Sequence, residues 1–377
     1  MERMSAARKR DVSVELLRII GACMVIGTHI KLNMAVENEY VLSRVWIGCL
    51  VGDGVAIFWL ILGCFYFGNT DAGKRYGRLF SRIIIPMLAF TAFMFFFHDF
   101  IVGKATLAES VRHTPEEYRR VVEQAVWHWF SETPGTGHFW YLWIYILAIL
   151  IFPMLKGARD ALVGDGTRDL KLLIAMFGLL IYNDLTGNDF FNFTHHTFGG
   201  LLGAIIWILT GDIVYRNRAL LKGRVGLGLA GLALAAGVNA LRAFVQYRCF
   251  LADPANSEPL YWYASFAYAH TLGLTAFVFG ISGAIENGPV SRVVAHVGPK
   301  TFGVYVWHVV VLEKLRALGV RKWLTRRLCV SAPGDLLFTA LYTLLIFLIS
   351  LAITEATSLV WRWIWRGRKG KAAAGGA

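Results

Sequence analysis

Long apolar segments recur along the chain, and short polar or basic segments separate them. About 20 apolar residues span the hydrocarbon core of a bilayer, so segments of this kind are candidate transmembrane helices. The expected spans are 13–33, 47–67, 79–98, 139–157, 170–186, 197–215, 223–243, 262–285, 300–318 and 335–362. The pattern predicts an all-α, polytopic membrane protein with about ten transmembrane helices, whose immediate partner is the lipid bilayer.

The composition agrees with a membrane protein. Of 377 residues, 56% are hydrophobic and 17% are charged, whereas soluble domains carry about 25% charged residues. Little sequence remains for a second domain, so a single transmembrane domain is expected over 1–377. It would begin with a basic segment at 1–12, contain its longest outer loop at 99–138 and end in a basic tail at 363–377. Within that loop, TPEEYRRVVEQAVWHWF predicts a helix capped by Thr114.

Basic residues indicate the orientation. They gather in the N-terminal segment, in the loops after the second and sixth spans and in the tail. With ten spans these segments share one side, which is expected to be the cytoplasm, together with both termini. The basic segment 314–327 is an exception: it is either an amphipathic surface segment or a sign that one span is miscounted. The net charge of +13 therefore has a topological explanation, and no nucleic-acid partner is expected.

The five cysteines include no CxxC pair, so a thiolate metal site is not expected. Cys249 and Cys329 fall in predicted outer loops, where a disulfide between them is conceivable. The apolar run after the basic N-terminus is too long for the core of a signal peptide and is interpreted as an uncleaved first span. The expected location is the cell membrane, with several crossings; in a bacterium this would be the inner membrane.

The first span, VSVELLRIIGACMVIGTHIKL, contains Glu15, Arg18 and His29 among apolar residues. An arginine at the centre of a span costs about 2.5–3.5 kcal/mol on insertion scales, so it is expected to face protein, water or a ligand. An eleven-residue separation returns a helix to within about 20° of the same face, roughly 16 Å further along its axis. One helix stripe therefore presents a fixed cation and a titratable imidazole. A snorkelling Arg18, an interfacial His29 and a structural Glu15–Arg18 pair are the alternatives.

Further histidines occur in or near the predicted spans. His138 opens the fourth span beside Trp140 and Tyr141, as part of an aromatic belt or as an acceptor-side residue. His308 lies deep in the ninth span, where it either bonds a neighbour or takes part in function. The remaining polar residues near span ends are expected to be interfacial: His98, Asp99, Asp184, His195, His196 and His270. The sequence contains no HExxH motif, Walker loop or dinucleotide fingerprint.

The spacing of Arg18 and His29 resembles the R-x10-H signature of the acyltransferase-3 family of membrane-bound O-acyltransferases, the O-acetyltransferase type. Four further segments resemble family motifs in the same order. VAIFWLILGCFYF resembles FFxxSG, with Leu62 where that motif has serine, and GRLFSRIIIPML resembles RIxP. HFWYLWIYILAILIFPML resembles HLWFL…P, and TFGVYVWHVVVL resembles SYxxYLxH. Together these segments extend over most of the chain.

The resemblance implies transfer of an acyl group, usually acetyl, from cytoplasmic acyl-CoA to a hydroxyl of an outer-facing glycan or lipid-linked sugar. Acetyl-CoA would be the donor, and no metal is expected. The functional arginine and histidine of the family map onto Arg18 and His29. Residue chemistry supports this role for His29, because imidazole titrates near working pH and suits a general base. An acetyl-histidine intermediate remains an alternative to direct transfer.

These arguments define the expected site. The catalytic residues are His29, Arg18 and Glu15. The residues expected to bind acyl-CoA are Arg18, Arg75, Arg78 and Arg82, because guanidinium groups suit phosphate; positive-inside anchoring is the alternative for the last three. The residues expected to bind the glycan or lipid-linked saccharide are His138, Trp140, Tyr141, Tyr305 and His308.

Two other functions stay open. A proton-coupled transporter or exporter of a sugar or lipid would also place ionisable residues in transmembrane helices. The second alternative is an acyltransferase-like scaffold that has lost activity, which Leu62 and Trp59 support.

Overall fold

The computed structural model describes residues 11–30, 32, 34–36, 39–68, 71–127, 133, 135–187, 198–253, 264–286 and 288–374. Most of these residues are helical, which confirms the predicted helical class. Two short strands, β1 (Ala35–Val36) and β2 (Glu39–Tyr40), form an antiparallel hairpin between the first two helices.

The helices follow one another with short connections. The first half contains α1 (Val12–Ile30), α2 (Leu42–Val51), α3 (Gly54–Tyr66), α4 (Ala72–Leu79), the π-helical turn η1 (Phe80–Ile84), α5 (Ile85–Val102), α6 (Leu107–Ser110), α7 (Pro115–Trp127), η2 (Gly137–Phe139), α8 (Trp140–Leu150) and α9 (Phe152–Leu162). The second half contains α10 (Gly166–Thr186), α11 (Phe198–Arg216), η3 (Arg218–Leu220), α12 (Val225–Ala252), α13 (Ala264–Ile285), α14 (Pro289–Val297), η5 (Gly298–Lys300), α15 (Thr301–Ala317), α16 (Val320–Leu328) and α17 (Ala332–Ala374).

Six stretches of the described chain are long and apolar enough to cross a membrane, or seven if α8 and α9 together form one broken span. The six are Val12–Ile30, Leu42–Tyr66, Ala72–Val102, Val225–Ala252, Ala264–Ile285 and Ala332–Leu359. The expected count of ten is therefore not confirmed. The segments expected at 170–186, 197–215 and 300–318 are helical as α10, α11 and α15, but they are not among the six.

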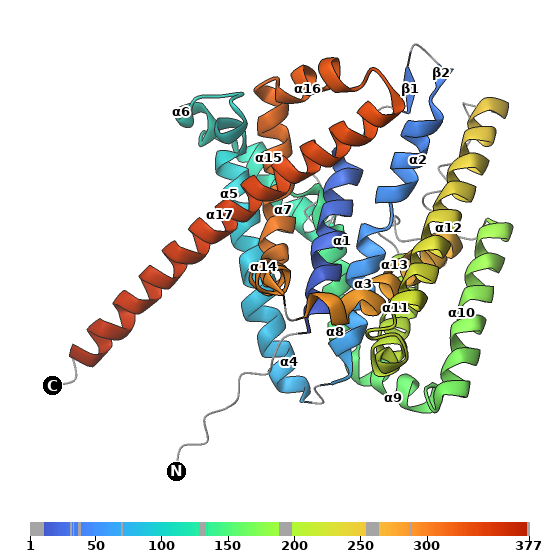
Figure 1. Ribbon diagram of the computed structural model, residues 1–377. Helices are drawn as coiled ribbons and strands as arrows, with labels where there is room; N and C mark the ends of the chain where they lie inside the picture. The colour runs from blue at the N-terminus through green and yellow to red at the C-terminus, as the bar shows by residue number, and fades with distance from the viewer. Residues whose placement is uncertain are drawn as a thin grey trace.

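Helix α1 occupies the middle of the bundle, and α3, α15 and α17 pack around it (Figure 1). The hairpin and α16 lie at one end of the bundle, here named the hairpin end. Helices α4 and α9 lie at the other, here named the α4 end (Figure 1). Leu17 and Met24 pack with Ile57 and Val278 on one face of α1. Other α1 residues pack against α15 and α17, so its polar residues face cavities inside the protein.

Two of the apolar segments are broken. Gly52 and Asp53 interrupt the helix between α2 and α3. Helices α8 and α9 meet at an angle of 70°, and Pro153 near the start of α9 removes a backbone donor at this bend. Irregular backbone inside a membrane is tolerated where protein or a cavity surrounds it, so each break marks a place to look for polar contacts.

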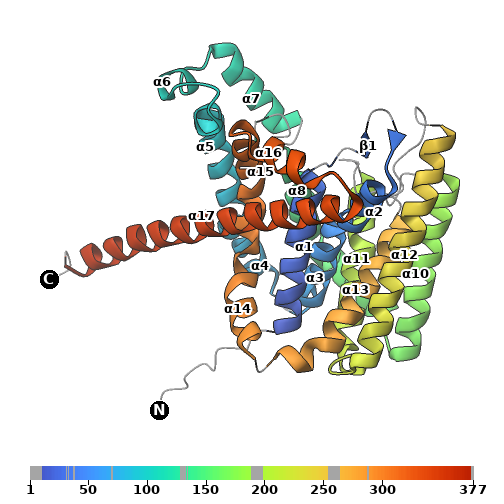
Figure 2. The ribbon, with the colours of Figure 1, turned by 45° about the horizontal axis from the view of Figure 1, so that its top comes forward.

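Helices α12 and α13 approach each other closely through glycines. A Cβ on Gly231 would lie 2.7 Å from the carbonyl oxygen of Gly273. A larger residue at position 231 would therefore force the two helices apart. The two ribbon views show these helices side by side (Figure 1, Figure 2). The Gly- and Ala-rich composition of the seventh expected span suits this close packing in lipid.

The helix predicted from TPEEYRRVVEQAVWHWF is present as α7. Thr114 accepts from the Glu117 backbone N–H at 3.2 Å, and the Glu117 carboxylate accepts from the Thr114 N–H at 2.6 Å and its hydroxyl at 2.9 Å. This reciprocal cap lowers the pKa of Glu117, because the Thr114 backbone N–H stabilises its charged form. Cys249 lies within α12 rather than in a loop, and no disulfide joins it to Cys329.

Candidate active site

Glu15 and Arg18 form an ion pair on α1. The Arg18 guanidinium lies 3.2 Å from the Glu15 carboxylate, as the three-residue spacing predicts. The Glu15 side chain is 7% exposed and packs against the η5 turn at Gly298. Arg18 is 29% exposed and lies 6.0 Å from the centre of the Phe65 ring. Glu15 thus holds Arg18 in place while leaving part of the guanidinium accessible.

Arg18 faces a cavity of about 330 Å³, here named the Arg18 cavity. Its wall is mainly apolar and aromatic and comes from α1, α3, η1, α8, η5 and α15. Tyr141 and Tyr305, two of the predicted acceptor residues, belong to this wall. Leu62 also lies there, so the position where the resembling motif has serine is an apolar part of the cavity surface. The mixture of one cation and many apolar groups is typical of small-molecule sites.

A second cavity of about 290 Å³ adjoins the first, here named the Arg78 cavity. Arg75, Arg78 and Arg82 all line it. The two cavities share Leu62, Phe65, Ile83 and Tyr145 in their walls. Together they form a path from the exposed arginines of α4 and η1 to Arg18 in the interior.

The three arginines of the Arg78 cavity differ in what holds them. The Arg75 guanidinium stacks 3.8 Å from the Phe152 ring centre and donates to the Tyr66 carbonyl. It therefore braces the helices as much as it faces the cavity. Arg78 and Arg82 are exposed, and neither forms a hydrogen bond or ion pair among the described residues. Their guanidinium groups are the ones available to an anion.

His29 faces a third cavity of about 670 Å³ towards the hairpin end, here named the His29 cavity. The hairpin, α2, α12 and α17 complete its wall, including Tyr40, Arg44, Phe250 and Thr339. The Tyr40 and Phe250 rings stack with centres 4.4 Å apart. Helix α1 thus places its two predicted functional residues against different cavities, Arg18 towards the α4 end and His29 towards the hairpin end.

His29, His138 and His308 gather into a histidine cluster contributed by α1, η2 and α15. The His29 ring centre lies 5.1 Å from that of His308 and 6.3 Å from that of His138. His138 and His308 are 4.8 Å apart. Sequence reasoning had treated the three residues separately, and the fold brings them together. The described residues contain no group of three His, Cys, Asp or Glu side chains placed to hold a metal ion.

Hydrogen bonding assigns a tautomer to His308. Its Nδ1 lies 2.6 Å from the Tyr305 carbonyl oxygen. A carbonyl only accepts, so in the neutral ring Nδ1 carries the proton and Nε2 presents a lone pair. His308 Nε2 and both ring nitrogens of His138 are buried and have no hydrogen-bond partner among the described residues. Buried polar atoms are normally bonded, so the cluster has spare hydrogen-bonding capacity.

Tyr305 connects the histidine cluster to the Arg18 cavity. Its ring lies 5.0 Å from His138 and its hydroxyl donates to the His138 carbonyl, while it also lines the cavity. Tyr141 lies 5.7 Å from Tyr305. Trp140 packs at the edge of the neighbouring apolar core. Of the residues expected to bind acceptor, His138 and His308 therefore adjoin His29, whereas Tyr141 and Tyr305 line the Arg18 cavity.

Asp53, Arg242 and His270 form a second buried group, the aspartate cluster. Two Arg242 nitrogens lie 3.1 and 3.2 Å from the Asp53 carboxylate oxygens. His270 Nδ1 lies 2.7 Å from Asp53 Oδ2. All three side chains are at most 1% exposed. His270, which was expected near the end of a span, thus has an acidic partner inside the protein.

Other residues expected at the interface also have protein partners. His98 is 4% exposed, and its ring nitrogens lie 2.9 Å from Asp99 and 2.5 Å from Glu313. Asp184 accepts from two backbone N–H groups at the start of α13. Residue Glu313 of α15 thus covers His98, so its ring is buried in the protein. His195 and His196 lie outside the described residues.

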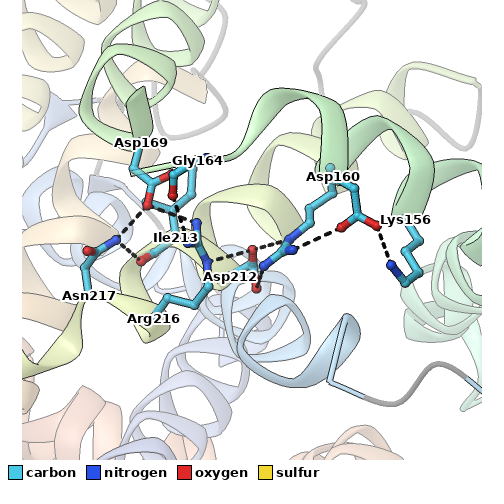
Figure 3. A network of polar contacts seen from close by, with 9 residues as sticks. Lys156, Asp160, Gly164, Asp169, Asp212, Ile213, Arg216 and Asn217 are labelled. Atoms are coloured by element: carbon cyan, nitrogen blue, oxygen red, sulfur yellow. Dashed lines mark hydrogen bonds and ion pairs between the residues drawn. The ribbon is translucent and has the colours of Figure 1, made fainter. Parts of the chain in front are cut away.

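A network of ion pairs joins α9, α10 and α11 at the α4 end (Figure 3). Arg159 Nε lies 2.8 Å from Asp212, and Arg216 bonds both Asp212 and Asp169. Asn217 also donates to Asp169 at 2.9 Å. These residues satisfy one another and line none of the three cavities described above, so the network joins helices rather than forming part of the candidate site.

The aspartate cluster had a detectable signal in the sequence. Asp53 and His270 are each the one residue of the Asp, Glu, Lys, Arg or His type in an expected span, and Arg242 shares its span only with Arg224 near the other end. Charges in membrane segments are rare and tend to pair, so residues of opposite sign in different spans predict contact. Their partners could not be assigned without the helix arrangement, because no sequence pattern links the three segments.

The model of a family described as an acyltransferase domain matches residues 11–355 of the chain. This match includes α1, the histidine cluster and all three cavities. Comparison with curated proteins and with solved structures finds no match.

Proposed function

The chain belongs to the acyltransferase-3 family and is a multi-pass membrane protein, and on this premise we propose that it transfers an acetyl group from acetyl-CoA to a sugar hydroxyl. The acceptor would be a glycan or a lipid-linked saccharide in the cell envelope. The observation that carries the proposal is the placement of Arg18 and His29. They belong to one helix and face two cavities, and ring contacts lead from His29 through His308, His138 and Tyr305 to the wall of the Arg18 cavity.

The donor would enter through the Arg78 cavity. Arg78 and Arg82 offer guanidinium groups to the phosphates of CoA. The pantetheine arm would then extend along the shared wall into the Arg18 cavity. Arg18 would contact the inner part of the arm, and Glu15 would keep it oriented. On this proposal the α4 end faces the cytoplasm, because that is where acyl-CoA is available.

The acceptor would bind in the His29 cavity. His29 would remove the proton from the hydroxyl, and the resulting oxygen nucleophile would attack the thioester carbonyl carbon. A C–O bond forms and the C–S bond breaks. The proton held by His29 passes to the departing thiolate, so CoA leaves as a thiol and His29 returns to its neutral form. Direct transfer of this kind needs no group beyond the two substrates and the base.

The remaining members of the cluster would orient the base. The acceptor lone pair of His308 Nε2 favours a neighbouring N–H donor. A His29 ring that donates in this direction would keep its other nitrogen free to take a proton. Tyr305 and His138 would hold this arrangement beside the Arg18 cavity. The transporter alternative is not favoured, since the family match indicates an acyltransferase.

Reconstitution tests the proposal directly. The purified protein in nanodiscs would be incubated with radiolabelled acetyl-CoA and envelope glycans, and products would be identified by mass spectrometry. The wild type should add acetyl groups and release CoA in equal amounts. His29→Ala should do neither while remaining folded. Solute transport without acetyl-CoA consumption, or equal activity of the wild type and His29→Ala, would contradict the proposal.

A further inference from the structure

Helix α2 forms one wall of the His29 cavity, to which it contributes Arg44, Ile47, Gly48 and Val51. It has only ten residues and ends at the break before α3. A helix this short is only marginally stable without contacts to other parts of the protein. Its contacts with neighbouring helices must therefore set the shape of this wall.

Polar contacts hold α2 at both ends. Near its start, Arg44 and Ser43 both lie 3.1 Å from the Asp335 carboxylate of α17. Near its end, Arg242 of α12 donates to the Cys49 carbonyl. Asn239, one turn before Arg242, donates to the Trp46 carbonyl at 3.4 Å. Helix α12 therefore supplies donors to two backbone carbonyls of α2.

The aspartate cluster makes the second attachment possible. Arg242 cannot remain fully buried as an isolated cation. Asp53 lies two residues after the end of α2 and neutralises Arg242 through two contacts, and His270 of α13 bonds the same carboxylate. Arg242 thereby links the α2–α3 break to α12, and His270 links it to α13. The cluster lines no described cavity itself.

A direct connection runs from the end of α2 to His29. The Thr28 hydroxyl donates to the Val51 carbonyl at 2.8 Å. Val51 lies two residues before Asp53, and Thr28 immediately precedes His29. Thr28, His29 and Val51 all line the His29 cavity. A shift of the α2 terminus would move both this wall and the backbone next to the proposed base.

We propose that Asp53, Arg242 and His270 are positioning residues that fix the broken end of α2 and so shape the His29 cavity for its acceptor. This inference rests on the proposed function for the identity of the ligand, but not for the effect on α2. Removal of the cluster should alter binding in the His29 cavity and leave the Arg18 and Arg78 cavities unchanged. If the cluster only stabilised the fold, its removal would affect all three cavities alike.

Cysteine labelling tests the position of α2 without requiring turnover. In a background with the five native cysteines replaced by alanine, Val51→Cys would report on the His29 cavity and Phe65→Cys on the Arg18 cavity. A polar maleimide would be applied to protein in nanodiscs, where both faces are accessible. The variant D53N/R242L removes both charges and retains an acceptor for His270. It should label at position 51 at least about fivefold faster, with no change at position 65.

Activity provides the second measurement, with acetyl-CoA as donor and methyl β-D-glucopyranoside as the probe acceptor. D53N/R242L should raise the KM for the glycoside roughly tenfold and leave the KM for acetyl-CoA unchanged. Its melting temperature should exceed that of Arg242→Leu, because no unpaired charge remains buried. If D53N/R242L regains the stability that Arg242→Leu loses but keeps a raised KM for the glycoside, the cluster positions α2 in addition to supporting the fold.

The controls keep the test decisive. D212N/R159L neutralises a matched ion pair between α9 and α11 and should leave labelling at position 51 unchanged. If D53N/R242L does not fold, Asn239→Leu removes one neutral donor to α2 and should produce a smaller change of the same kind. Unchanged labelling at position 51, or an equal change at position 65, would overturn the inference. Wild-type protein that transfers no acetyl would count against the proposed function, while labelling would still report on α2.

Discussion

The protein contains two buried polar clusters, and they differ in how far they are satisfied. In the aspartate cluster, Arg242 and His270 both bond the Asp53 carboxylate away from the three cavities, and one buried nitrogen, Arg242 Nε, has no hydrogen-bond partner among the described residues. In the histidine cluster, His29 lines a cavity, and three buried nitrogens of His138 and His308 have no hydrogen-bond partner among the described residues. A network of paired charges stabilises one arrangement of helices, whereas several unpartnered nitrogens leave hydrogen-bonding capacity next to the cavity. The comparison separates residues that position from residues that react.

The largest expected effect is on the histidine cluster. His29→Ala should lower kcat for acetyl transfer by roughly 10²–10⁴-fold, because general-base catalysis contributes about that factor. Its melting temperature in nanodiscs should stay close to that of the wild type. His296→Ala is the matched control, since His296 is an exposed histidine that pairs with Glu355. Equal losses in the two variants would remove the distinction between His29 and a surface histidine.

The next effect concerns the aspartate cluster and is expected in stability. Arg242→Leu leaves the buried Asp53 carboxylate without its main partner, which should lower the free energy of unfolding by about 3–5 kcal/mol. Thermal denaturation or the yield of folded protein measures this loss. Partial restoration in D53N/R242L is expected, because both charges are then absent. If the single variant is as stable as the wild type, the ion pair does not maintain the fold.

His308→Leu should have the opposite signature. Its Nε2 has no partner among the described residues, and its Nδ1 bonds the Tyr305 carbonyl one turn earlier on the same helix. An apolar replacement of similar size therefore removes one bond within α15 and should change the melting temperature little. The loss of an orienting group should lower kcat by roughly 10–100-fold, as for residues that orient a metal-bound histidine. Steady-state kinetics and thermal denaturation on the same preparation would decide. A large loss of stability with unchanged kcat would assign His308 to packing.

The smallest effect should come from the Arg78 cavity. R78Q/R82Q should raise the KM for acetyl-CoA about tenfold, more at low ionic strength than at high, because both guanidinium groups are exposed and salt screens them. The KM for the acceptor should not change. Lys74→Gln serves as control, since Lys74 pairs with Asp71 and does not line the cavity. An unchanged KM would mean that the donor phosphates bind elsewhere.

Local sequence patterns predicted the helices better than they predicted the membrane crossings. The apolar runs are helical, and the Thr114 cap starts α7. The number of crossings depends on helix length and on breaks. Pro153 bends one expected span by 70°, and Asp53 interrupts another. Such breaks are stabilised by distant partners such as Arg242, which a sequence window does not contain.

The candidate site was predictable within one helix and not between helices. The positions of Glu15, Arg18 and His29 follow from helical spacing, and the structure places them as an ion pair and two cavity-facing residues. The meeting of His29 with His138 and His308 depends on how α1, η2 and α15 pack. Arg75 shows the converse, because its stacking on Phe152 could not be read from a run of basic residues.

Helix α17 has a length that its surroundings must accommodate. Its apolar part, Ala332–Leu359, contains 28 residues and is therefore about 42 Å long, against roughly 30 Å for a hydrocarbon core. A helix longer than the core can be accommodated by inclining from the bilayer normal, and both views show α17 crossing the bundle obliquely (Figure 1, Figure 2). Asp335 and Thr339, which contact α2 and the His29 cavity, lie on this helix. We therefore expect the thickness of the surrounding lipid to influence the wall that encloses His29.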